Sequence, residues 1–360
     1  MPWPRSIGVV LHDLPLGGTE RIALRLSRAW ISLGVEVTLF VGLPEGPLAP
    51  LVPAGARLVA ADPPLPRRRG SRRRLGDAAA RHFAASPVDA LFVIGNWHWD
   101  VVPALAALRP RSVIVAQASS PLAMPRRGRL RQWWFERRMR RTLRAVNAVA
   151  AMDAMSACDT DRILGRRVAR VISLPAIDDD AGPPRAPPSA PLVLAAGRLI
   201  RQKGFDLLID AVAALPDVRL TIVGDGPERV RLARLIGRRG LAGRVTLAGF
   251  ADDIRPWLDR CRLFVLPSRY EGYGAVIVEA LAAGRPVIAT RTTPAADDLL
   301  GVPARGLVVP PDDVPALADA ISAMLAAPPP DPAMLAAATG CYRLATGAAA
   351  YLDLFADARA

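Results

Sequence analysis

The stretch LFVLPSRYEGYGAVIVEALAAGRPVIAT, residues 263–290, decides the fold. It begins and ends with apolar runs that suit buried β-strands, and between them lie a glycine-rich turn and an alanine-rich helical segment. A strand, a helix and a second strand in this order indicate a parallel sheet, because parallel strands need a crossover connection. The connection carries two carboxylates, Glu271 in the turn and Glu279 in the helix. They are either ordinary surface charges or two contacts to one ligand.

The same alternation of apolar runs and helix-like segments recurs along the 360 residues. The apolar runs are continuous, which is typical of strands buried on both faces of a parallel sheet. In the first half they are SIGVVL, VEVTLFV, DALFVI, RSVIVA and AVNAVAAM, and in the second half PLVLAAG, VRLTIVG, RVTLAG, RLFVLPS, RPVIAT and GLVVP. The sequence therefore predicts an α/β protein with two doubly wound, Rossmann-like domains.

Proline and small residues in AGPPRAPPSAP, residues 181–191, predict a linker between these domains. We expect an N-terminal domain over residues 1–180, a C-terminal domain over 192–335 and a further helix over 336–360. The charge run RRRGSRRR, residues 67–74, is expected to form a surface loop.

Composition narrows the class of protein. The formal net charge is +14, carried by arginine, and Lys203 is the only lysine. Such a surplus could serve nucleic acid, anionic lipid or phosphorylated substrates. Nucleic-acid binding is disfavoured, because the sequence has neither a recognition module nor aromatic residues interleaved with basic ones on a sheet. The N-terminus lacks a signal-peptide pattern, no uncharged apolar stretch reaches the ~18 residues of a membrane span, and the three cysteines are scattered. We expect a cytoplasmic protein.

Cations follow the first predicted strand of the second half. Arg198 and Lys203 come directly after VLAAG, and ligands of doubly wound folds bind at the carboxyl ends of strands. An arginine fork and a lysine point charge could together clamp a diphosphate. The alternative is a solvated turn with two stray cations.

The turn before Glu279 is suited to an anion. Gly272 and Gly274 remove side chains where a ligand could approach the backbone, and the following helix N-terminus offers free N–H groups. Glu271 lies just before this helix and Glu279 just over one turn inside it, so the two carboxylates could flank a bound anion. Carboxylates accept hydrogen bonds from sugar hydroxyls. A glycosidase-type pair is the alternative, although carboxylates of one strand–loop–helix unit would not easily face each other across a glycosidic bond.

Five stretches occur in a fixed order and spacing. In the second half they are GRLIRQKGFDLLIDA, VGDGPER, LPSRYEGYGAVIVEALAAGRPVIAT and GLVVPPDD, and near the N-terminus the stretch is LGGTERIALRLSRAWISLGVEVTLF. Together they resemble the retaining glycosyltransferases of the GT-B fold, glycosyltransferase family 4, and the N-terminal stretch is similar to the glycine loop and first helix of that family. The resemblance implies two Rossmann-like domains facing a cleft, with a C-terminal helix that crosses back to the N-terminal domain.

The resemblance also implies roles for particular residues. The donor is a nucleotide-sugar such as a UDP- or GDP-sugar, Arg198 and Lys203 neutralise its phosphates, and no metal or other cofactor is expected. Glu271 holds the transferred sugar. The remaining donor contacts are Gly17 and Gly18 at the diphosphate, Phe250 at the base, the Gly272, Tyr273 and Gly274 turn beside the sugar, and Glu279 at the ribose.

One position departs from the family pattern. Many members carry a histidine after the strand VIVA of the N-terminal domain, and this chain has Gln117. Glutamine can hydrogen-bond a hydroxyl but cannot act as a base, so we expect Gln117 to position the sugar or the acceptor. His98, in NWHWD, is expected to have a structural or acceptor-contact role.

The acceptor implied by the resemblance is a glycan or lipid-linked saccharide of polysaccharide or lipopolysaccharide synthesis. Two other classes remain as alternatives, a GT-B UDP-sugar 2-epimerase and a basic nucleic-acid-binding protein. The epimerase family lacks the register of the motifs quoted above.

A basic segment of the first half predicts attachment to the inner face of the cytoplasmic membrane. PRRGRLRQWWFERRMRRTLRAV, residues 125–146, places Leu130, Trp133, Trp134, Met139 and Leu143 among arginines. Basic amphipathic helices of this kind lie in the interface of anionic bilayers. The alternative is that both tryptophans pack against the domain core.

Overall fold

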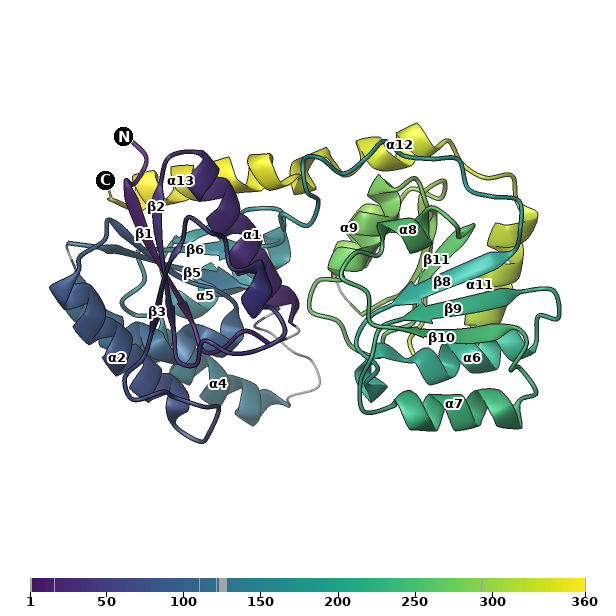
Figure 1. The fold of residues 1–360 in the computed structure, drawn as a ribbon, viewed down its shortest axis with the longest axis horizontal. Helices are drawn as coiled ribbons and strands as arrows, with labels where there is room; N and C mark the ends of the chain where they lie inside the picture. Colours follow the sequence, from purple (N-terminus) through teal and green to yellow (C-terminus); the bar gives the residue numbers. More distant parts are fainter. Residues whose placement is uncertain are drawn as a thin grey trace. The chain divides into compact units, whose positions relative to one another are not determined.

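The computed structural model describes residues 2–15, 17–109, 111–120, 122, 128–292 and 294–359. The chain divides into two compact units. Unit 1 comprises Met1–Pro175 and Arg343–Ala360, and unit 2 comprises Ala176–Tyr342. Each unit is an α/β layer structure built on a parallel sheet, so the predicted fold class is confirmed (Figure 1).

The described residues of unit 1 form a seven-stranded sheet in the order β3-β2-β1-β4-β5-β6-β7. All neighbouring strands are parallel. The strands are β1 Ser6–Leu11, β2 Glu36–Val41, β3 Arg57–Ala60, β4 Ala90–Val93, β5 Val113–Ala118, β6 Ala148–Ala151 and β7 Ala169–Val171. Strands β1, β4, β5 and β6 are almost wholly buried, as their continuous apolar sequences predict.

Helices cover both faces of this sheet. The helices of unit 1 are α1 Gly18–Ser32, α2 Ser71–Ala85, α3 Val102–Leu105, α4 Arg129–Thr142, α5 Ala154–Leu164 and α13 Leu344–Arg359. Helices α2, α3, α4 and α5 share one core on one face. Helices α1 and α13 pack together on the other face, where Trp30 contacts Phe92, Tyr351 and Phe355 (Figure 1).

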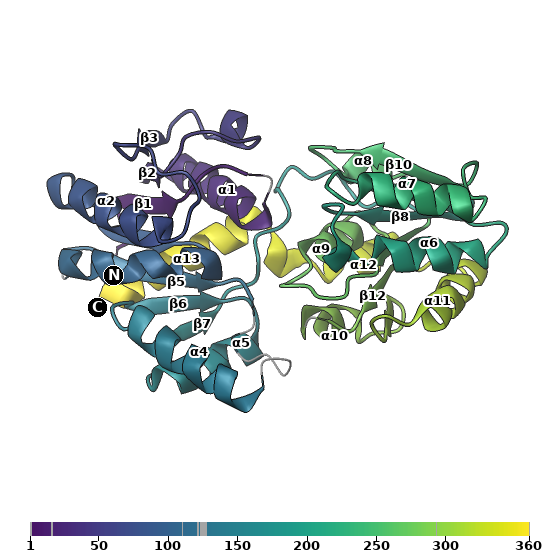
Figure 2. The same ribbon diagram turned by 90° about the horizontal axis from the view of Figure 1, so that it is seen from below.

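The described residues of unit 2 form a six-stranded parallel sheet in the order β10-β9-β8-β11-β12-β13. The strands are β8 Leu192–Ala196, β9 Arg219–Val223, β10 Val245–Gly249, β11 Leu263–Leu266, β12 Val287–Thr290 and β13 Gly306–Val309. The helices are α6 Phe205–Ala213, α7 Arg229–Arg238, α8 Arg255–Leu258, α9 Ala275–Ala282, α10 Pro294–Leu300, α11 Val314–Ala326 and α12 Pro332–Ala337. Helices α6, α7 and α11 share one core, on the face seen in Figure 2.

The chain passes between the units twice, after Pro175 and after Tyr342. The first crossing, after Pro175, comes earlier than the linker expected at residues 181–191. The structure places that expected linker within unit 2. Arg255 Nη1 donates to the Gly182 carbonyl at 2.8 Å, and the buried Arg285 donates through Nη1 to the Arg185 carbonyl at 2.9 Å. The proline-rich segment is therefore held against unit 2 by hydrogen bonds from arginines to its backbone carbonyls. The composition of the segment does not predict these bonds.

The arginine-rich run 67–74 was expected as a loop, and this prediction is wrong for its second half. Helix α2 begins at Ser71, whose side chain is buried. The Ser71 hydroxyl accepts a hydrogen bond from the Arg68 N–H at 3.2 Å and contacts His12 Nε2 at 2.8 Å. The start of the helix is therefore anchored in the interior of unit 1.

Candidate functional site

The strand order of unit 2 reverses between β8 and β11. From β8 the chain proceeds outward to β9 and β10, and from β11 it proceeds outward the other way to β12 and β13. Ligands of open parallel sheets bind at such a switch point, outside the carboxyl ends of the strands. The loops that follow β8 and β11 carry Lys203 and Glu271.

These two side chains are paired. Lys203 Nζ lies 2.5 Å from Glu271 Oε2, and the side chains are only 18% and 12% exposed. The same carboxylate accepts from the Ser268 hydroxyl at 3.1 Å and, through Oε1, from the Gly272 N–H at 3.3 Å. The structure thus joins the lone lysine, the first glutamate and the glycine turn in one polar cluster.

Backbone contacts hold the two loops together. Lys203 lies in a short 3-10 turn, Arg201–Lys203, which ends at Gly204 with φ of 65°. A Cβ on Gly204 would lie 2.0 Å from the Pro267 carbonyl oxygen, so only glycine permits this approach. Gln202 accepts from the Arg269 N–H at 2.8 Å through its carbonyl and donates through Nε2 to the Tyr270 carbonyl at 2.9 Å.

The glycine turn leads into α9. Gly274 has φ of 84° and is the N-cap of that helix, which no side chain caps. Tyr273 is 7% exposed, and its hydroxyl lies 3.2 Å from the Tyr342 hydroxyl. Glu279 lies on α9 and is half-buried. The helix end therefore presents backbone N–H groups beside Glu271, as an anion site requires.

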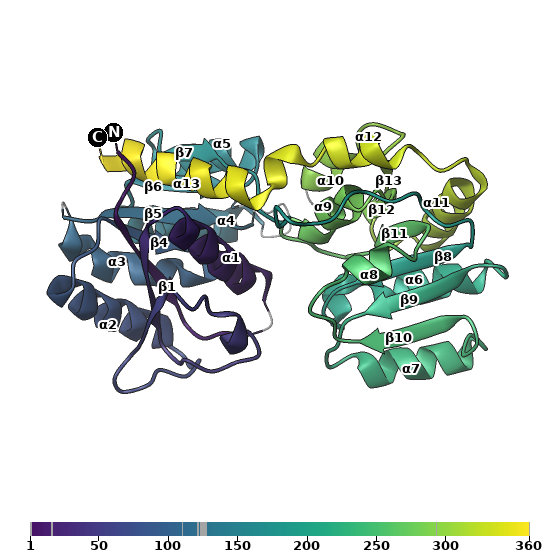
Figure 3. The ribbon, with the colours of Figure 1, turned by 45° about the horizontal axis from the view of Figure 1, so that its top comes forward.

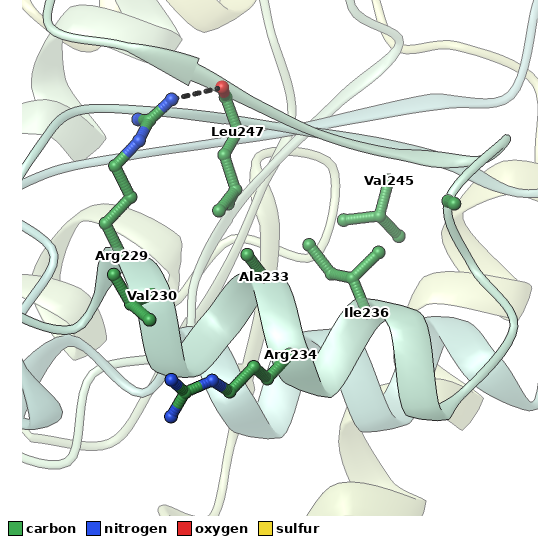
Figure 4. Close-up of a pocket in the computed structure, with 8 residues that line it drawn as sticks. Arg229, Val230, Ala233, Arg234, Ile236, Val245 and Leu247 are labelled. Atoms are coloured by element: carbon green, nitrogen blue, oxygen red, sulfur yellow. Dashed lines mark hydrogen bonds between the residues drawn. The ribbon is translucent and has the colours of Figure 1, made fainter.

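Two predicted donor residues of unit 2 lie outside this polar cluster. Arg198 is exposed in the loop after β8, and Phe250 is 47% exposed directly after β10. A groove of about 650 Å³ lies between α7 and β10, lined in part by Ile236, Val245 and Leu247 (Figure 4). At one end of the groove Arg229 Nη2 donates to the Leu247 carbonyl at 3.4 Å. The groove follows the sheet edge and is not formed by the loops that hold Lys203 and Glu271.

Unit 1 has its own switch point, between β1 and β4. The loops after these strands are tied by His98, which is fully buried. His98 Nε2 accepts from the His12 N–H at 3.2 Å, so Nδ1, 2.8 Å from the Ile94 carbonyl, carries the proton. Burial lowers the pKa of His98 to about 4. Both imidazole nitrogens are thus hydrogen-bonded to backbone groups of unit 1.

Charged side chains gather at the same switch point. Arg67 donates to Asp13 at 2.6 Å and to Glu20 at 3.3 Å, and its guanidinium lies 4.2 Å from the centre of the Trp97 ring. Trp97 is 37% exposed. Burial raises the pKa of Glu20 despite the Arg67 charge. Arg72 also lies near this ring, at 5.2 Å, and pairs with Asp100 at 3.1 Å.

Gly17 and Gly18 mark the start of α1 in this region. A Cβ on Gly17 would lie 2.2 Å from Glu20 Oε2, whereas nothing lies within 4 Å of a Cβ on Gly18. Gly17 thus makes room for the Glu20 carboxylate, and Gly18 leaves its side of the helix end uncovered. Glu20 was not predicted as a site residue, although a glutamate three residues after the N-cap is one half of the capping-box pattern.

Gln117 is buried in the interior of unit 1. Its Nε2 donates to the Tyr351 hydroxyl of α13 at 2.6 Å, and its Oε1 has no hydrogen-bond partner among the described residues. Burial raises the pKa of Tyr351 above its ordinary value. The Gln117 side chain therefore contacts the C-terminal helix. Its partner Tyr351 lies 234 positions away, so sequence spacing could not indicate this contact.

Helix α4 divides the apolar residues of the predicted membrane segment into two groups. Met139 and Leu143 are buried in the core of unit 1, so their expected surface position is wrong. Leu130, Trp133 and Trp134 are 78%, 51% and 63% exposed, so the two tryptophans are not core residues. Arg126 and Arg127 lie outside the described residues.

No group of three potential ligand side chains is placed to hold a metal ion within the described part of the chain. Within the same ranges, no helix has both the length and the apolar character needed to cross a bilayer.

Comparison with known proteins gives two family matches. The family model Glycosyltransferase Family 4 matches residues 16–173, and Glycosyl transferases group 1 matches residues 190–327. Lipopolysaccharide core biosynthesis glycosyltransferase LpsE of Rhizobium meliloti is 47% identical over 106 residues, which are 29% of this chain and 31% of that protein. The 2-deoxystreptamine N-acetyl-D-glucosaminyltransferase of Streptomyces fradiae is 28% identical over 88% of this chain and 82% of that protein. The match to the first of these relatives thus spans about a third of its length.

Solved structures share the fold. Sucrose-phosphate synthase from Thermosynechococcus elongatus has a TM-score of 0.77 at 22% identity, covering 98% of both chains. Anabaena HepE in complex with UDP and glucose has a TM-score of 0.70 at 20% identity, covering 96% of this chain and 94% of that one. At these identities the likenesses show a shared fold and do not indicate a substrate.

Proposed function

Because the chain belongs to the group 1, family 4 glycosyltransferases of the GT-B fold, we propose that it transfers a sugar from a nucleotide-sugar to a glycan or lipid-linked saccharide, with retention of anomeric configuration. The single observation that carries the proposal is the pairing of Lys203 with Glu271 at the switch point of unit 2, beside the N-terminus of α9. A cation, a carboxylate and free helix N–H groups are what a sugar diphosphate requires in one place.

In the proposed reaction, Lys203 and Arg198 meet the charge that develops on the leaving diphosphate. Backbone N–H groups of the glycine turn and of the N-terminus of α9 donate hydrogen bonds to the phosphates. Glu271 accepts hydrogen bonds from the transferred sugar, and Glu279 from the ribose. The bond between the anomeric carbon and the phosphate oxygen breaks, the acceptor oxygen bonds on the same face, and the leaving phosphate oxygen takes the acceptor proton.

Phe250 is proposed to lie against the base, since it is exposed directly after β10. In unit 1, Gly17 and Gly18 are proposed as diphosphate contacts. No metal is assigned a role, because Lys203, Arg198 and the helix end supply the positive charge that the diphosphate needs.

The acceptor side is proposed to lie at the switch point of unit 1. Asp13 is a hydrogen-bond acceptor there, and Trp97 offers a partly exposed ring of the kind on which sugars stack. Homologous proteins include lipopolysaccharide core enzymes of Rhizobium meliloti, so a saccharide of the cell envelope is the proposed acceptor class. Gln117 and His98 would act on this side only indirectly, because both side chains are buried.

We place the enzyme in the cytoplasm, at the inner face of the membrane. The support is the exposed cluster of Leu130, Trp133 and Trp134 on an arginine-rich helix. This location would bring the protein to a lipid-linked acceptor.

A panel of UDP- and GDP-sugars tests the donor proposal. A nucleotide-sugar that binds only the folded state must raise the melting temperature. The stabilising donor should be turned over, and NMR of the product should show the donor's anomeric configuration. Glu271→Gln and Glu279→Gln should each abolish most turnover while both variants remain folded. The unfolding midpoint of Glu279→Gln should stay near that of the parent, whereas Glu271→Gln leaves Lys203 without its carboxylate and should lower it. Near-parental turnover in both variants would remove the basis of the site.

A further inference from the structure

Two buried tyrosine hydroxyls meet at the glycine turn of unit 2. The hydroxyls of Tyr273 and Tyr342 lie 3.2 Å apart, and the ring centroids lie 6.3 Å apart. The side chains are 7% and 9% exposed. Burial raises the pKa of Tyr342, and the Tyr273 hydroxyl donates a hydrogen bond to the Tyr342 hydroxyl.

Tyr342 is also the last residue of unit 2 before the chain returns to unit 1. Its carbonyl accepts a hydrogen bond from the Ile177 N–H at 3.1 Å, and Ile177 is the second residue after the chain enters unit 2. The entry and the exit of the chain are therefore bonded to each other within unit 2. Tyr342 lies at this junction through its backbone and at the glycine turn through its hydroxyl.

The segment before Tyr342 is packed firmly. Helix α12 lies against α9, the helix that carries Glu279 (Figure 3). Leu335 of α12 is fully buried, and a Cβ on Gly284 would lie 2.5 Å from the Pro332 side chain. The Tyr342 N–H donates to the Thr339 carbonyl at 3.0 Å. The neighbour of Tyr273 is thus a well-packed segment, so a movement of the glycine turn would also displace or strain Tyr342.

The two sides of the turn have different partners. On one side Glu271 is held by Lys203 and Ser268, groups that the proposed function assigns to the donor site or places beside it. On the other side Tyr273 is held by Tyr342. Only three residues of chain, 271–273, separate the partners of Glu271 from the contact with Tyr342. A change in the partners of Glu271 can therefore alter the position of Tyr342.

We propose that the Tyr273–Tyr342 hydroxyl pair is a positioning device that couples the glycine turn to the paired chain crossings of unit 2. A ligand that orders the turn around Glu271 then also orders the crossings, and by linkage an ordered crossing improves binding at the turn. Neither tyrosine hydroxyl is a catalytic group in this scheme. The ligand is the nucleotide-sugar of the proposed function, whereas the coupling itself exists without it.

Hydrogen exchange of the ligand-free protein tests the coupling directly. Tyr342→Phe keeps the ring and removes the hydroxyl, and Tyr351→Phe is a matched control that removes a buried hydroxyl of unit 1. In Tyr342→Phe, backbone amides of residues 271–276 and 176–178 should both exchange severalfold faster than in the parent. Unchanged exchange at 271–276, or the same acceleration in Tyr351→Phe, would overturn the proposal. If Tyr342→Phe does not fold, Tyr273→Phe removes the same bond from the other side and should give the same two accelerations.

Steady-state kinetics with the donor found in the panel give an independent readout. Tyr273→Phe and Tyr342→Phe should each raise the donor KM severalfold, with a smaller change in kcat. The double variant should be no worse than the worse single variant, because both substitutions remove one bond. When Tyr273→Phe is combined with Tyr351→Phe, the fold-changes in donor KM of the two single variants should instead multiply. Multiplicative loss in the Tyr273–Tyr342 double variant would overturn the coupling. Altered exchange in the apoprotein without a response to any nucleotide-sugar would support the coupling and count against the proposed function.

Discussion

Lys203 Nζ lies 2.5 Å from Glu271 Oε2, so the chain's only lysine is paired with the carboxylate of the glycine turn. The two residues are 68 positions apart in the sequence and meet because β8 and β11 are parallel neighbours. In the proposed reaction, the donor diphosphate competes with Glu271 for the lysine. The pair would then hold the two loops in place until phosphate oxygens replace the carboxylate at Lys203.

Lys203→Met should lower kcat/KM by about 10²–10³, the usual loss when one group that stabilises transition-state charge is removed. It should also lower the free energy of unfolding by about 1–3 kcal/mol, because Glu271 is left largely buried without its cation. Arg201→Met is the matched control, an exposed cation of the same 3-10 turn. Steady-state kinetics and urea unfolding measure both effects. Equal losses in the two variants would show that the position of the charge is immaterial.

Gln117→Ala should act mainly on stability. The substitution leaves the buried Tyr351 hydroxyl without its partner and opens a cavity, which together should cost about 2–4 kcal/mol. Adding Tyr351→Phe should recover part of that loss, because the unpaired hydroxyl is then absent. Urea unfolding of the three variants measures this. The expectation that Gln117 positions sugar or acceptor stays a prediction, and a raised acceptor KM in a fully stable Gln117→Ala protein would favour it over the stability role.

Acid should destabilise unit 1 through His98. Its pKa is about 4 when folded and 6.5 in the reference state, so the unfolded chain takes up a proton that the folded chain does not. Stability is therefore fully present above pH 6.5 and falls as the pH drops from 6.5 to 4, by at most about 3 kcal/mol. His98→Gln, whose amide offers a donor and an acceptor without a charge, should flatten this slope in urea unfolding. Parallel slopes for parent and variant would assign the acid loss to other groups, of which His12 is the first to test because its pKa is also lowered by burial.

Chelation should leave turnover nearly unchanged. Lys203, Arg198 and the N-terminus of α9 are assigned the charge that a divalent ion would otherwise supply. The rate with the identified donor is measured with and without EDTA. The variant Lys203→Met, which lacks part of the positive charge assigned to the diphosphate site, is measured in the same way. Loss of the parental rate in EDTA, followed by recovery with magnesium or manganese, would contradict the assignment.

Strands that contain buried residues were predictable from sequence, and the two strands without any were not. The apolar runs located every strand of unit 2 among the described residues, whereas β3 and β7 of unit 1 were missed. These two are the edge strands of their sheet, and all of their residues are exposed or half-exposed. An edge strand is buried on fewer sides, so its sequence carries less of the continuous apolar signal.

The candidate site was predictable only where local sequence shapes it. The glycine turn and the helix after it follow from residues 272–276, and the family resemblance added the likeness to a donor site. The Lys203–Glu271 pair, the Gln117–Tyr351 bond and the Asp13–Arg67–Glu20 cluster join residues from different loops or helices. Such pairings depend on strand order and side-chain direction, which the periodicity of one segment does not specify.

The surface of α4 predicts association with anionic bilayers. Leu130, Trp133 and Trp134 are exposed apolar side chains, and each nearby cation at a membrane surface adds about 1 kcal/mol of attraction. The arginines of the helix are not equivalent, because Arg138 pairs with Asp100 at 2.8 Å and Arg140 donates to the Ile163 carbonyl at 2.8 Å. Replacing those two would disturb packing within unit 1.

Flotation with liposomes measures the association. The parent protein should float with phosphatidylglycerol-containing vesicles at low salt and be released at high salt, since screening weakens attraction between exposed charges. Arg131, Arg137, Arg141 and Arg144 are exposed on or next to α4, and changing all four to glutamate should abolish flotation while leaving the melting temperature near parental. Trp133→Ser with Trp134→Ser should weaken binding even to strongly anionic vesicles, because the buried apolar area is lost. A parent protein that stays at the bottom of the gradient with anionic vesicles at low salt would exclude this surface as a membrane anchor and favour a soluble acceptor.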